Sequence, residues 1–163
     1  MMKQELIMDA AGNDLSRQTA EIMHRFNDVF QLHDPSALAE LVARDCVIEN
    51  TVPAPDGARH AGKEACIDLW SAIATQPGTR FDLEETFVAG ERATIRWRYF
   101  MAGGNSIRGV NLMRVADGLI VEAMGYVTSR DRSVVTEVAQ KRAGSETVLT
   151  KLSELMFVDV LRR

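Results

Sequence analysis

The spacing of apolar residues changes near residue 78, and this change limits the folds open to the chain. Before it, apolar residues recur at every third or fourth position, which is the period of an amphipathic helix. After it, they alternate with polar residues, as in strands that bury one face. Three turn signals divide residues 80–128 into four strands. The turn signals are Ala89–Glu91, Gly103–Asn105 and Asp117–Gly118. The sequence therefore predicts an α+β fold in which helices precede an antiparallel meander.

Three helices and one strand are predicted in the first half of the chain. A short second helix starts at Asp34-Pro35, because Asp caps helix N-termini and Pro fits the first helical turn. A strand at 46–50 leads into a Pro- and Gly-rich loop, and the third helix begins at Gly62. The first helix, over 16–30, buries one face, formed by Ile22, Met23, Phe26, Val29 and Phe30. The third does the same with Cys66, Leu69, Trp70 and Ile73.

The meander contains one strand whose two faces differ clearly. In 94–101, alternation places Arg96 and Arg98 on the outer face. The opposite face, expected to point to the core, carries Ile95, Trp97, Tyr99 and Met101. In the next strand Asn111 lies between Val110 and Leu112, where an amide has poor strand propensity and needs a partner if it is buried.

The length of the chain predicts one domain with two appendages. With 163 residues, 46% of them hydrophobic, the chain can bury one core but is short for two full domains. We expect a flexible N-terminus over 1–15, one body over 16–130 and a helical extension over 131–163. The last helix of the extension is apolar on several faces, so it should dock on the body or on another chain.

Charge and composition argue against several partners. The net charge of -4, with Lys and Arg spread among acidic residues, argues against nucleic acid. No segment approaches the roughly 20 apolar residues of a membrane span, and the N-terminus lacks a signal-peptide core, so we expect no membrane partner and a cytoplasmic protein. In the reducing cytoplasm, Cys46 and Cys66 should be buried thiols. No metal-ligand spacing or dinucleotide fingerprint is present, so no metal or other cofactor is expected.

The order of these elements, together with local motifs, resembles the nuclear transport factor 2-like superfamily and, within it, the SnoaL-like (polyketide cyclase-like) family. The motifs are FNDVF, LAELVARDCVIEN, GARHAGKEAC and the run from RFDLEETFVAGERATIRWRYF to RGVNLMRVADGLIVEAMGYV, which together extend over about 17–128. The resemblance implies a cone-shaped curved sheet wrapped around the first helix. It also implies a homodimer, in which the outer sheet face with Arg96 and Arg98 often forms the contact.

The resemblance further implies an apolar pocket at the wide end of the cone. Such a lining suits a hydrophobic, ring-containing small molecule. The positions expected to point inward are Phe26, Phe30, Ile48, Asn50, Trp70, Ile95, Trp97, Tyr99, Asn111, Ala123, Gly125 and Val127.

Known chemistries of this fold match the chain only in part. Where steroid isomerases have a carboxylate base, a tyrosine and a protonated aspartate, this chain has Asn50, Phe26 and Asn111. The base is therefore missing, although Asn111 can still donate a hydrogen bond to a carbonyl oxygen. Epoxide hydrolases of this fold need a tyrosine and an aspartate where this chain has Ile48 and Gly125.

For the isomerase, cyclase or dehydratase class, the remaining acid/base candidates are His60, Asp56 and Glu49. His60 is the best of them, because a histidine with an ordinary pKa of about 6.5 can take and give a proton at cellular pH. The resulting hypothesis is that His60 is the acid/base and that Asn50 and Asn111 hold a substrate oxygen.

Simpler interpretations stay open beside this hypothesis. Asn50 can end its strand by bonding to the loop backbone, and His60 can be a solvated loop residue. The protein can also be a non-catalytic ligand-binding module, or a dimeric assembly module whose tail helix docks a partner. The tail, VVTEVAQKRAGSETVLTKLSELMFVDVLRR, weakly resembles the helical end of the sensor domain in AraC-type regulators.

Overall fold

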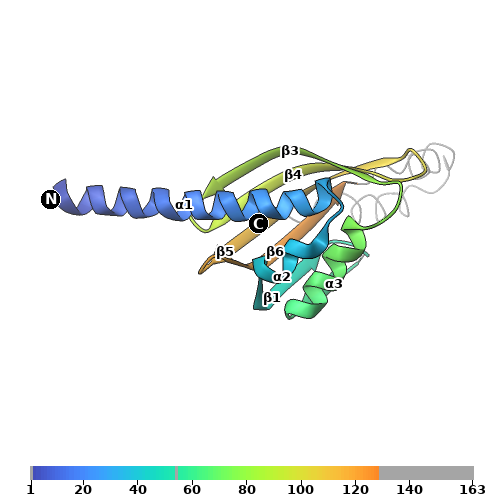
Figure 1. The fold of residues 1–163 in the computed structure, drawn as a ribbon, viewed down its shortest axis with the longest axis horizontal. Helices are drawn as coiled ribbons and strands as arrows, with labels where there is room; N and C mark the ends of the chain where they lie inside the picture. Colours follow the sequence, from blue (N-terminus) through green and yellow to red (C-terminus); the bar gives the residue numbers. More distant parts are fainter. Residues whose placement is uncertain (1, 54, 129–163) are drawn as a thin grey trace, which may run out of the picture.

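The computed structural model describes residues 2–53 and 55–128, so the extension predicted over 131–163 lies outside the described residues. Six strands form one sheet in the order β2-β1-β6-β5-β4-β3, in which β1 and β6 pair in parallel and the other neighbours pair antiparallel (Figure 1). The strands are β1 (Val42–Asn50), β2 (Ala58–Ala61), β3 (Arg80–Ala89), β4 (Arg92–Phe100), β5 (Ser106–Ala116) and β6 (Leu119–Thr128). The helices are α1 (Met2–Gln31), the 3-10 helix η1 (Pro35–Ala37), α2 (Leu38–Leu41) and α3 (Lys63–Ala74).

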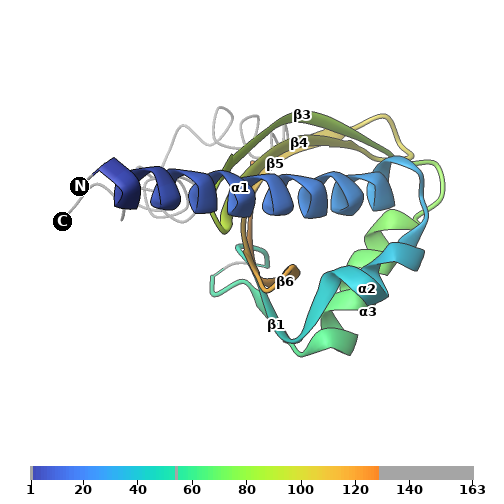
Figure 2. The same cartoon turned by 60° about the vertical axis from the view of Figure 1, so that its left-hand side comes forward.

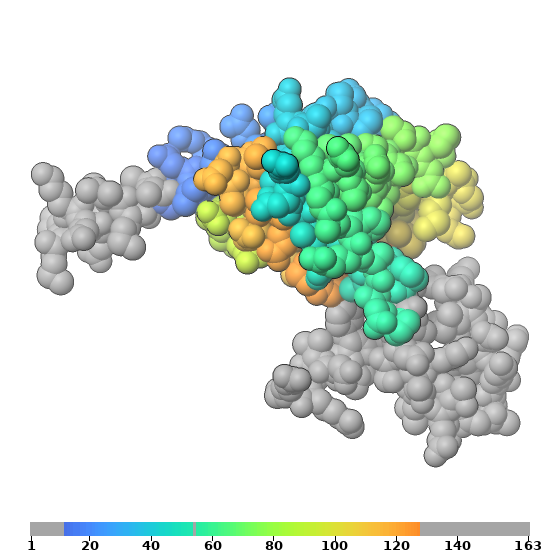
Figure 3. Space-filling view, turned by 90° about the horizontal axis from the view of Figure 1, so that it is seen from below, coloured from blue at the N-terminus to red at the C-terminus, as the bar shows by residue number. Residues whose placement is uncertain are grey.

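The predicted α+β cone is confirmed. The sheet curls around α1, and α2 and α3 close the remaining side (Figure 2). The three turn signals each join two antiparallel strands, from β3 through β6. The space-filling view from below shows α3, in green, forming much of this surface of the body (Figure 3). Among the described residues, no helix combines the length and apolar character needed to cross a membrane.

Helix α1 is longer than the sequence predicted. Apolar spacing predicted a start at Ser16 after a flexible N-terminus, whereas α1 begins at Met2. Residues 2–11 contain no Pro and are rich in Met, Gln, Glu, Leu and Ala, which have high helix propensity. Residues 12–15 are exposed, so no core contact gives this part of the helix the apolar spacing that marks 16–30. The domain boundary at residue 16 stays a prediction.

The segment between α1 and α3 also differs from the prediction. Strand β1 begins at Val42 and not at residue 46. Val42 and Ala43 are buried, and Val42 pairs with Ile120 of β6 before an irregularity in the register. The predicted loop before Gly62 contains the short strand β2, which pairs with the end of β1. Four residues with two alanines carry too little alternation to be recognised as a strand from sequence.

The core lies between α1, the short helices and the concave face of the sheet. Ile95 is fully buried, as its strand pattern predicted, but Met101 is 40% exposed, so its predicted inward position is wrong. Met101 follows the end of β4 and lies in the turn to β5, where the alternation of the strand no longer applies. Asn27 on α1 is also buried, and its Nδ2 donates to Thr86 Oγ1 at 3.4 Å.

Candidate functional site

A cavity of about 220 Å³ opens between α1, α3 and the concave face of the sheet. Aromatic and aliphatic side chains form most of its wall, and a few polar groups interrupt it. The lining residues are Phe26, Phe30, Asn50, Val52, Leu69, Trp70, Ile73, Gln76, Phe81, Trp97, Tyr99, Ile107, Asn111, Gly125 and Val127.

A connected series of aromatic rings forms the apolar wall. Phe26 meets Phe30 and Trp70 edge-on, with ring centroids 5.1 and 4.8 Å apart. Phe81 continues the series, with its ring 5.3 Å from Phe30 and 6.0 Å from Trp97. These separations are those of favourable aromatic pairs, so the rings hold one another in place. The wall therefore joins α1 and α3 to strands β3 and β4.

Two amides face each other on the sheet side of the cavity. Asn50 on β1 and Asn111 on β5 are both paired with Gly125 on the strand between them, β6. A Cβ on Gly125 would collide with Asn50 Oδ1 and would lie 3.6 Å from Asn111 Oδ1. The missing side chain of Gly125 therefore leaves the space that both amides share.

The hydrogen bonds of these amides are incomplete. Trp97 Nε1 donates to Asn111 Oδ1 at 3.2 Å. Within residues 2–53 and 55–128, neither Asn111 Nδ2 nor the Asn50 side chain makes a hydrogen bond. Each amide NH₂ group carries two donors. The two amides therefore bring their oxygens to the space above Gly125 and have N–H groups that no described residue pairs.

Tyr99 lies at the α3 side of the cavity. Its hydroxyl is 3.1 Å from Gln76 Oε1 and 3.4 Å from the carbonyl oxygen of Ile73, and the hydroxyl can donate to either oxygen. Of the lining residues that the structure describes, Tyr99 alone has an ionisable side chain. The described part of the lining therefore offers orienting hydrogen bonds but no carboxylate or imidazole.

The structure brings most of the predicted inward positions together in this cavity. Ile48, Ile95 and Ala123 lie instead in the closed core, with at most 3% of their surface exposed. Six lining residues were not predicted: Val52, Leu69, Ile73, Gln76, Phe81 and Ile107. Leu69 and Ile73 were recognised as the apolar face of their helix, which was the available signal, whereas Val52 sits in a loop without any pattern.

The three acid/base candidates lie away from the cavity lining. His60 is on β2 opposite Ile48, and its backbone carbonyl accepts a hydrogen bond from Cys66 Sγ at 3.6 Å. Glu49 forms an ion pair with Arg59 at 3.3 Å. Glu49 and Asp56 both line a separate hollow of about 350 Å³ beside β1 and β6.

Both cysteines are buried free thiols beneath this part of the sheet. Cys66 Sγ donates to the carbonyl oxygen of Cys46 at 3.4 Å. Burial raises the pKa of the Cys46 thiol to about 12, with the neighbouring Cys66 adding to the effect, and burial also raises the pKa of Cys66. The two groups therefore stay neutral at physiological pH and serve packing. The described residues contain no group of three or more His, Cys, Asp or Glu placed to hold a metal ion.

Comparison with known proteins assigns the family. Residues 23–123 match the SnoaL-like domain family. None of the curated proteins matches the sequence. The crystal structure of an NTF2-like protein of unknown function from Mesorhizobium loti is 83% identical, and the match covers 70% of this chain and 93% of that protein with a TM-score of 0.68.

More distant solved structures share the fold. A putative ketosteroid isomerase from Kribbella flavida is 18% identical, over 70% of this chain and 80% of that protein, with a TM-score of 0.61. A putative polyketide cyclase from Sinorhizobium meliloti is 25% identical, over 64% and 93%, with a TM-score of 0.54. Because the domain match spans most of the described body and the Mesorhizobium loti relative is 83% identical, this protein belongs to the SnoaL-like family of NTF2-like proteins.

Proposed function

We propose that the protein binds a small, hydrophobic, ring-containing molecule that carries an oxygen atom. The carrying observation is that a continuous aromatic wall lines one cavity together with the amides of Asn50 and Asn111, whose N–H groups make no hydrogen bond with the described residues. Rings would pack against the wall, and an oxygen would lie at the amides. This combination of apolar lining with a few convergent polar groups is characteristic of small-molecule sites.

The size of the cavity limits the ligand. Its volume of about 220 Å³ is below the roughly 300–1,000 Å³ of sites for drug-sized ligands. One or two rings would fit, whereas the four fused rings of a steroid would not. Asn50 and Asn111 are half-buried, so a ligand oxygen that accepts from their N–H groups would gain orientation as well as affinity.

Catalysis by an isomerase, cyclase or dehydratase mechanism is the second proposal. In it, His60 moves a proton while Asn50 and Asn111 bind the substrate oxygen. Since the described residues of the cavity lining include no carboxylate or imidazole, the substrate would have to extend toward β2 to meet His60. For this reason a non-catalytic ligand-binding role is the function that the geometry supports best.

The chain carries its own reporters for a binding test. Its two tryptophans, Trp70 and Trp97, both line the cavity, so a bound ligand should change their fluorescence. We expect saturable quenching by 2-cyclohexen-1-one and by two-ring ketones, and weaker binding to Asn111→Leu. Glu21→Gln, an exposed change on α1, is the matched control and should bind like the wild type. Absence of saturable quenching by every compound of the panel would contradict the proposal.

The catalytic proposal has a separate readout. The same compounds, incubated with the protein and followed by liquid chromatography and mass spectrometry, should be converted by the wild type and not by His60→Ala. Retention of each compound without conversion would leave the binding function and remove the catalytic one.

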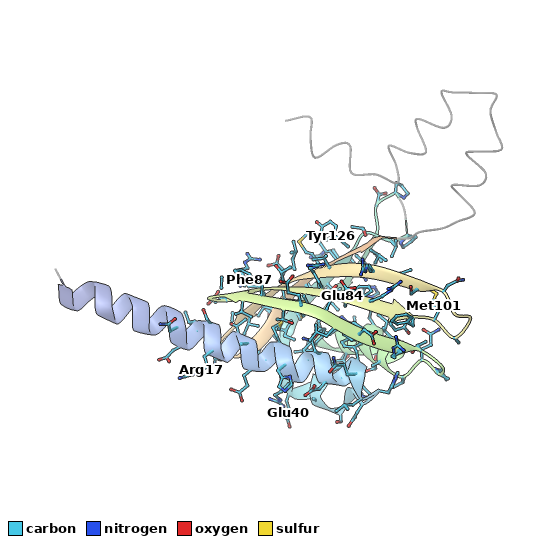
Figure 4. All side chains as sticks on the ribbon, turned by 90° about the horizontal axis from the view of Figure 1, so that it is seen from above. Arg17, Glu40, Glu84, Phe87, Met101 and Tyr126 are labelled. Carbon is cyan, nitrogen blue, oxygen red and sulfur yellow. The ribbon has the colours of Figure 1, made fainter. Side chains whose placement is uncertain are left out.

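A cytoplasmic homodimer is also proposed. The outer sheet face exposes Phe87 (66%) and Leu112 (41%), and Figure 4 shows Phe87 and Tyr126 projecting from the sheet away from α1. Ion pairs between strands surround this apolar area, including Arg108 with Glu84 at 2.8 Å. Apolar residues within a charged rim are typical of protein contacts. Light scattering should give a dimer mass for the wild type and a monomer mass for Phe87→Glu; a wild-type monomer would contradict the proposal.

A further inference from the structure

From the atoms that surround Gly125 we infer that the cavity recognises its ligand by a hydroxyl group that donates to the amide oxygen of Asn111, so that ring alcohols bind more tightly than the matching ring ketones. The inference rests on the proposed binding function and names the class of ligand: hydroxylated ring compounds. It reverses the expectation from sequence that Asn111 donates to a carbonyl oxygen. Asn111 touches the ligand, whereas Trp97 acts through Asn111 and is a positioning residue.

The amide atoms nearest to the space above Gly125 are both oxygens. Gly125 is buried in β6 between Asn50 and Asn111. Apart from the chain neighbours of Gly125, the three atoms nearest to the position of a Cβ on this residue are Asn50 Oδ1, Asn50 Cγ and Asn111 Oδ1, the last of them 3.6 Å away. Both amide nitrogens lie farther from that position. A ligand atom in this space therefore meets two hydrogen-bond acceptors before it meets a donor.

Trp97 fixes the orientation of the Asn111 amide. An indole N–H can only donate, so the Asn111 atom that lies 3.2 Å from Trp97 Nε1 must be the amide oxygen. Turning the amide would oppose two donors and lose this hydrogen bond. The indole itself has little freedom, because a Cβ on Gly109 would collide with its six-membered ring and because it meets Phe81 with ring centroids 6.0 Å apart. A carbonyl oxygen has two lone pairs, so Asn111 Oδ1 accepts from Trp97 and keeps one lone pair for a ligand.

The amide of Asn50 is not fixed in this way. Its side chain makes no hydrogen bond to any other described residue, so it can turn either its oxygen or its NH₂ group toward a ligand. The two amides together thus offer one fixed acceptor, on Asn111, and one group that adapts to the ligand.

A hydroxyl group matches this pair. Its proton donates to Asn111 Oδ1, and its oxygen accepts from Asn50 Nδ2 once that amide has turned. A ketone oxygen carries no proton, so it can accept from Asn50 but opposes its lone pairs to those of Asn111 Oδ1. An ammonium group could donate to both oxygens, but Tyr99 alone among the described lining residues is ionisable, so no carboxylate of this lining would balance the buried charge. Neutral ring alcohols are therefore the ligands that the two amides favour.

Two ligands of nearly equal size, 2-cyclohexen-1-ol and 2-cyclohexen-1-one, test the inference. Isothermal titration calorimetry should show that the wild-type protein binds the alcohol roughly fivefold more tightly, which is the effect of one additional hydrogen bond. In Asn111→Leu, which lacks the acceptor, the alcohol should lose this advantage. In Trp97→Phe the amide of Asn111 is free to turn and donate to the ketone, so the advantage should also fall. The two ligands differ in hydration by the same amount in every experiment, so a change in the ratio of their dissociation constants reports on the protein group that was changed.

Controls separate recognition of the hydroxyl group from simple loss of structure. Asn50→Leu should weaken both ligands and leave the alcohol preferred, because Trp97 and not Asn50 holds the oxygen of Asn111. A thermal melt of each variant checks the fold, and the wild type with Asn111→Leu tests the inference even where Trp97→Phe does not fold. Equal affinity of the wild type for the two ligands, a preference for the ketone, or an unchanged preference in folded Asn111→Leu would overturn the inference and leave the binding function intact. Binding of neither ligand, nor of the two-ring ketones, would overturn both.

Discussion

Replacing Gly109 with alanine is the most direct test of the packing that supports the cavity. Gly109 is buried in β5 with a backbone that any residue can adopt, so the substitution introduces no backbone strain. Its effect comes from the new methyl group, which would occupy the position of the Trp97 ring. The indole must then move toward the cavity and give up its contact with Phe81 and its hydrogen bond to Asn111.

The expected cost follows from these contacts. Forcing an extra carbon into a packed site costs about 1–3 kcal/mol. Loss of the Trp97–Asn111 hydrogen bond adds about 1 kcal/mol. The stiffer unfolded chain of the alanine variant returns about 0.4–1 kcal/mol. We therefore expect Gly109→Ala to lower the free energy of unfolding by about 2 kcal/mol.

Urea denaturation followed by tryptophan fluorescence and by circular dichroism measures this change. Gly103→Ala is the matched control, because a Cβ on Gly103 meets no atom within 4 Å and its φ is not in the left-handed region. That variant should be as stable as the wild type or slightly more stable. If Gly109→Ala lowers the free energy of unfolding by less than about 0.5 kcal/mol, the reasoning is refuted. The Trp97 indole would then have space to move without losing its packing contacts.

Three further predictions concern other parts of the body. Gly125→Ala should keep the fold but weaken binding of 2-cyclohexen-1-one by roughly fivefold or more, because the new methyl group displaces the Asn50 side chain. An unchanged dissociation constant in the fluorescence titration would contradict this prediction. Asn27→Leu should raise the free energy of unfolding by about 1 kcal/mol in urea denaturation, because Asn27 Oδ1 is buried and accepts no hydrogen bond from the described residues. A loss of stability would show that the hydrogen bond from Asn27 Nδ2 to Thr86 contributes more than the unpaired oxygen costs. The pKa of Cys46 is raised in the folded state, so the contribution of its neutral thiol to stability should be complete below about pH 9 and should be lost as the pH rises toward 12. Cys46→Ala should flatten this alkaline decrease in stability. A wild-type stability that does not change with pH in that range would argue against the prediction.

Much of the fold was readable from local sequence. The change of apolar period near residue 78 and the three turn signals predicted helices followed by a meander, and the structure confirms both. The alternation around Trp97 and Tyr99 predicted which face of β4 points inward. These features are determined by sequence because they depend on residues a few positions apart.

Local patterns failed where no buried face existed to produce them. The first turns of α1 are helical without core contacts over 12–15, and the strand β2 is only four residues long. Met101 continued the alternation of β4 in sequence but lies past the end of the strand, where the chain turns. A periodic pattern records burial, so it is silent on exposed elements and does not mark where an element stops.

Only the tertiary structure decided which inward residues line the cavity. Ile48 and Asn50 point to the same face of β1, yet Ile48 is closed into the core and Asn50 borders the cavity. The row of Asn50, Gly125 and Asn111 exists because β1 pairs in parallel with a strand more than 70 residues later in the chain. The sequence by itself determined the helices, the meander and the inward face of its strands. The register between distant strands, which local spacing does not encode, brought the two amides together around one glycine.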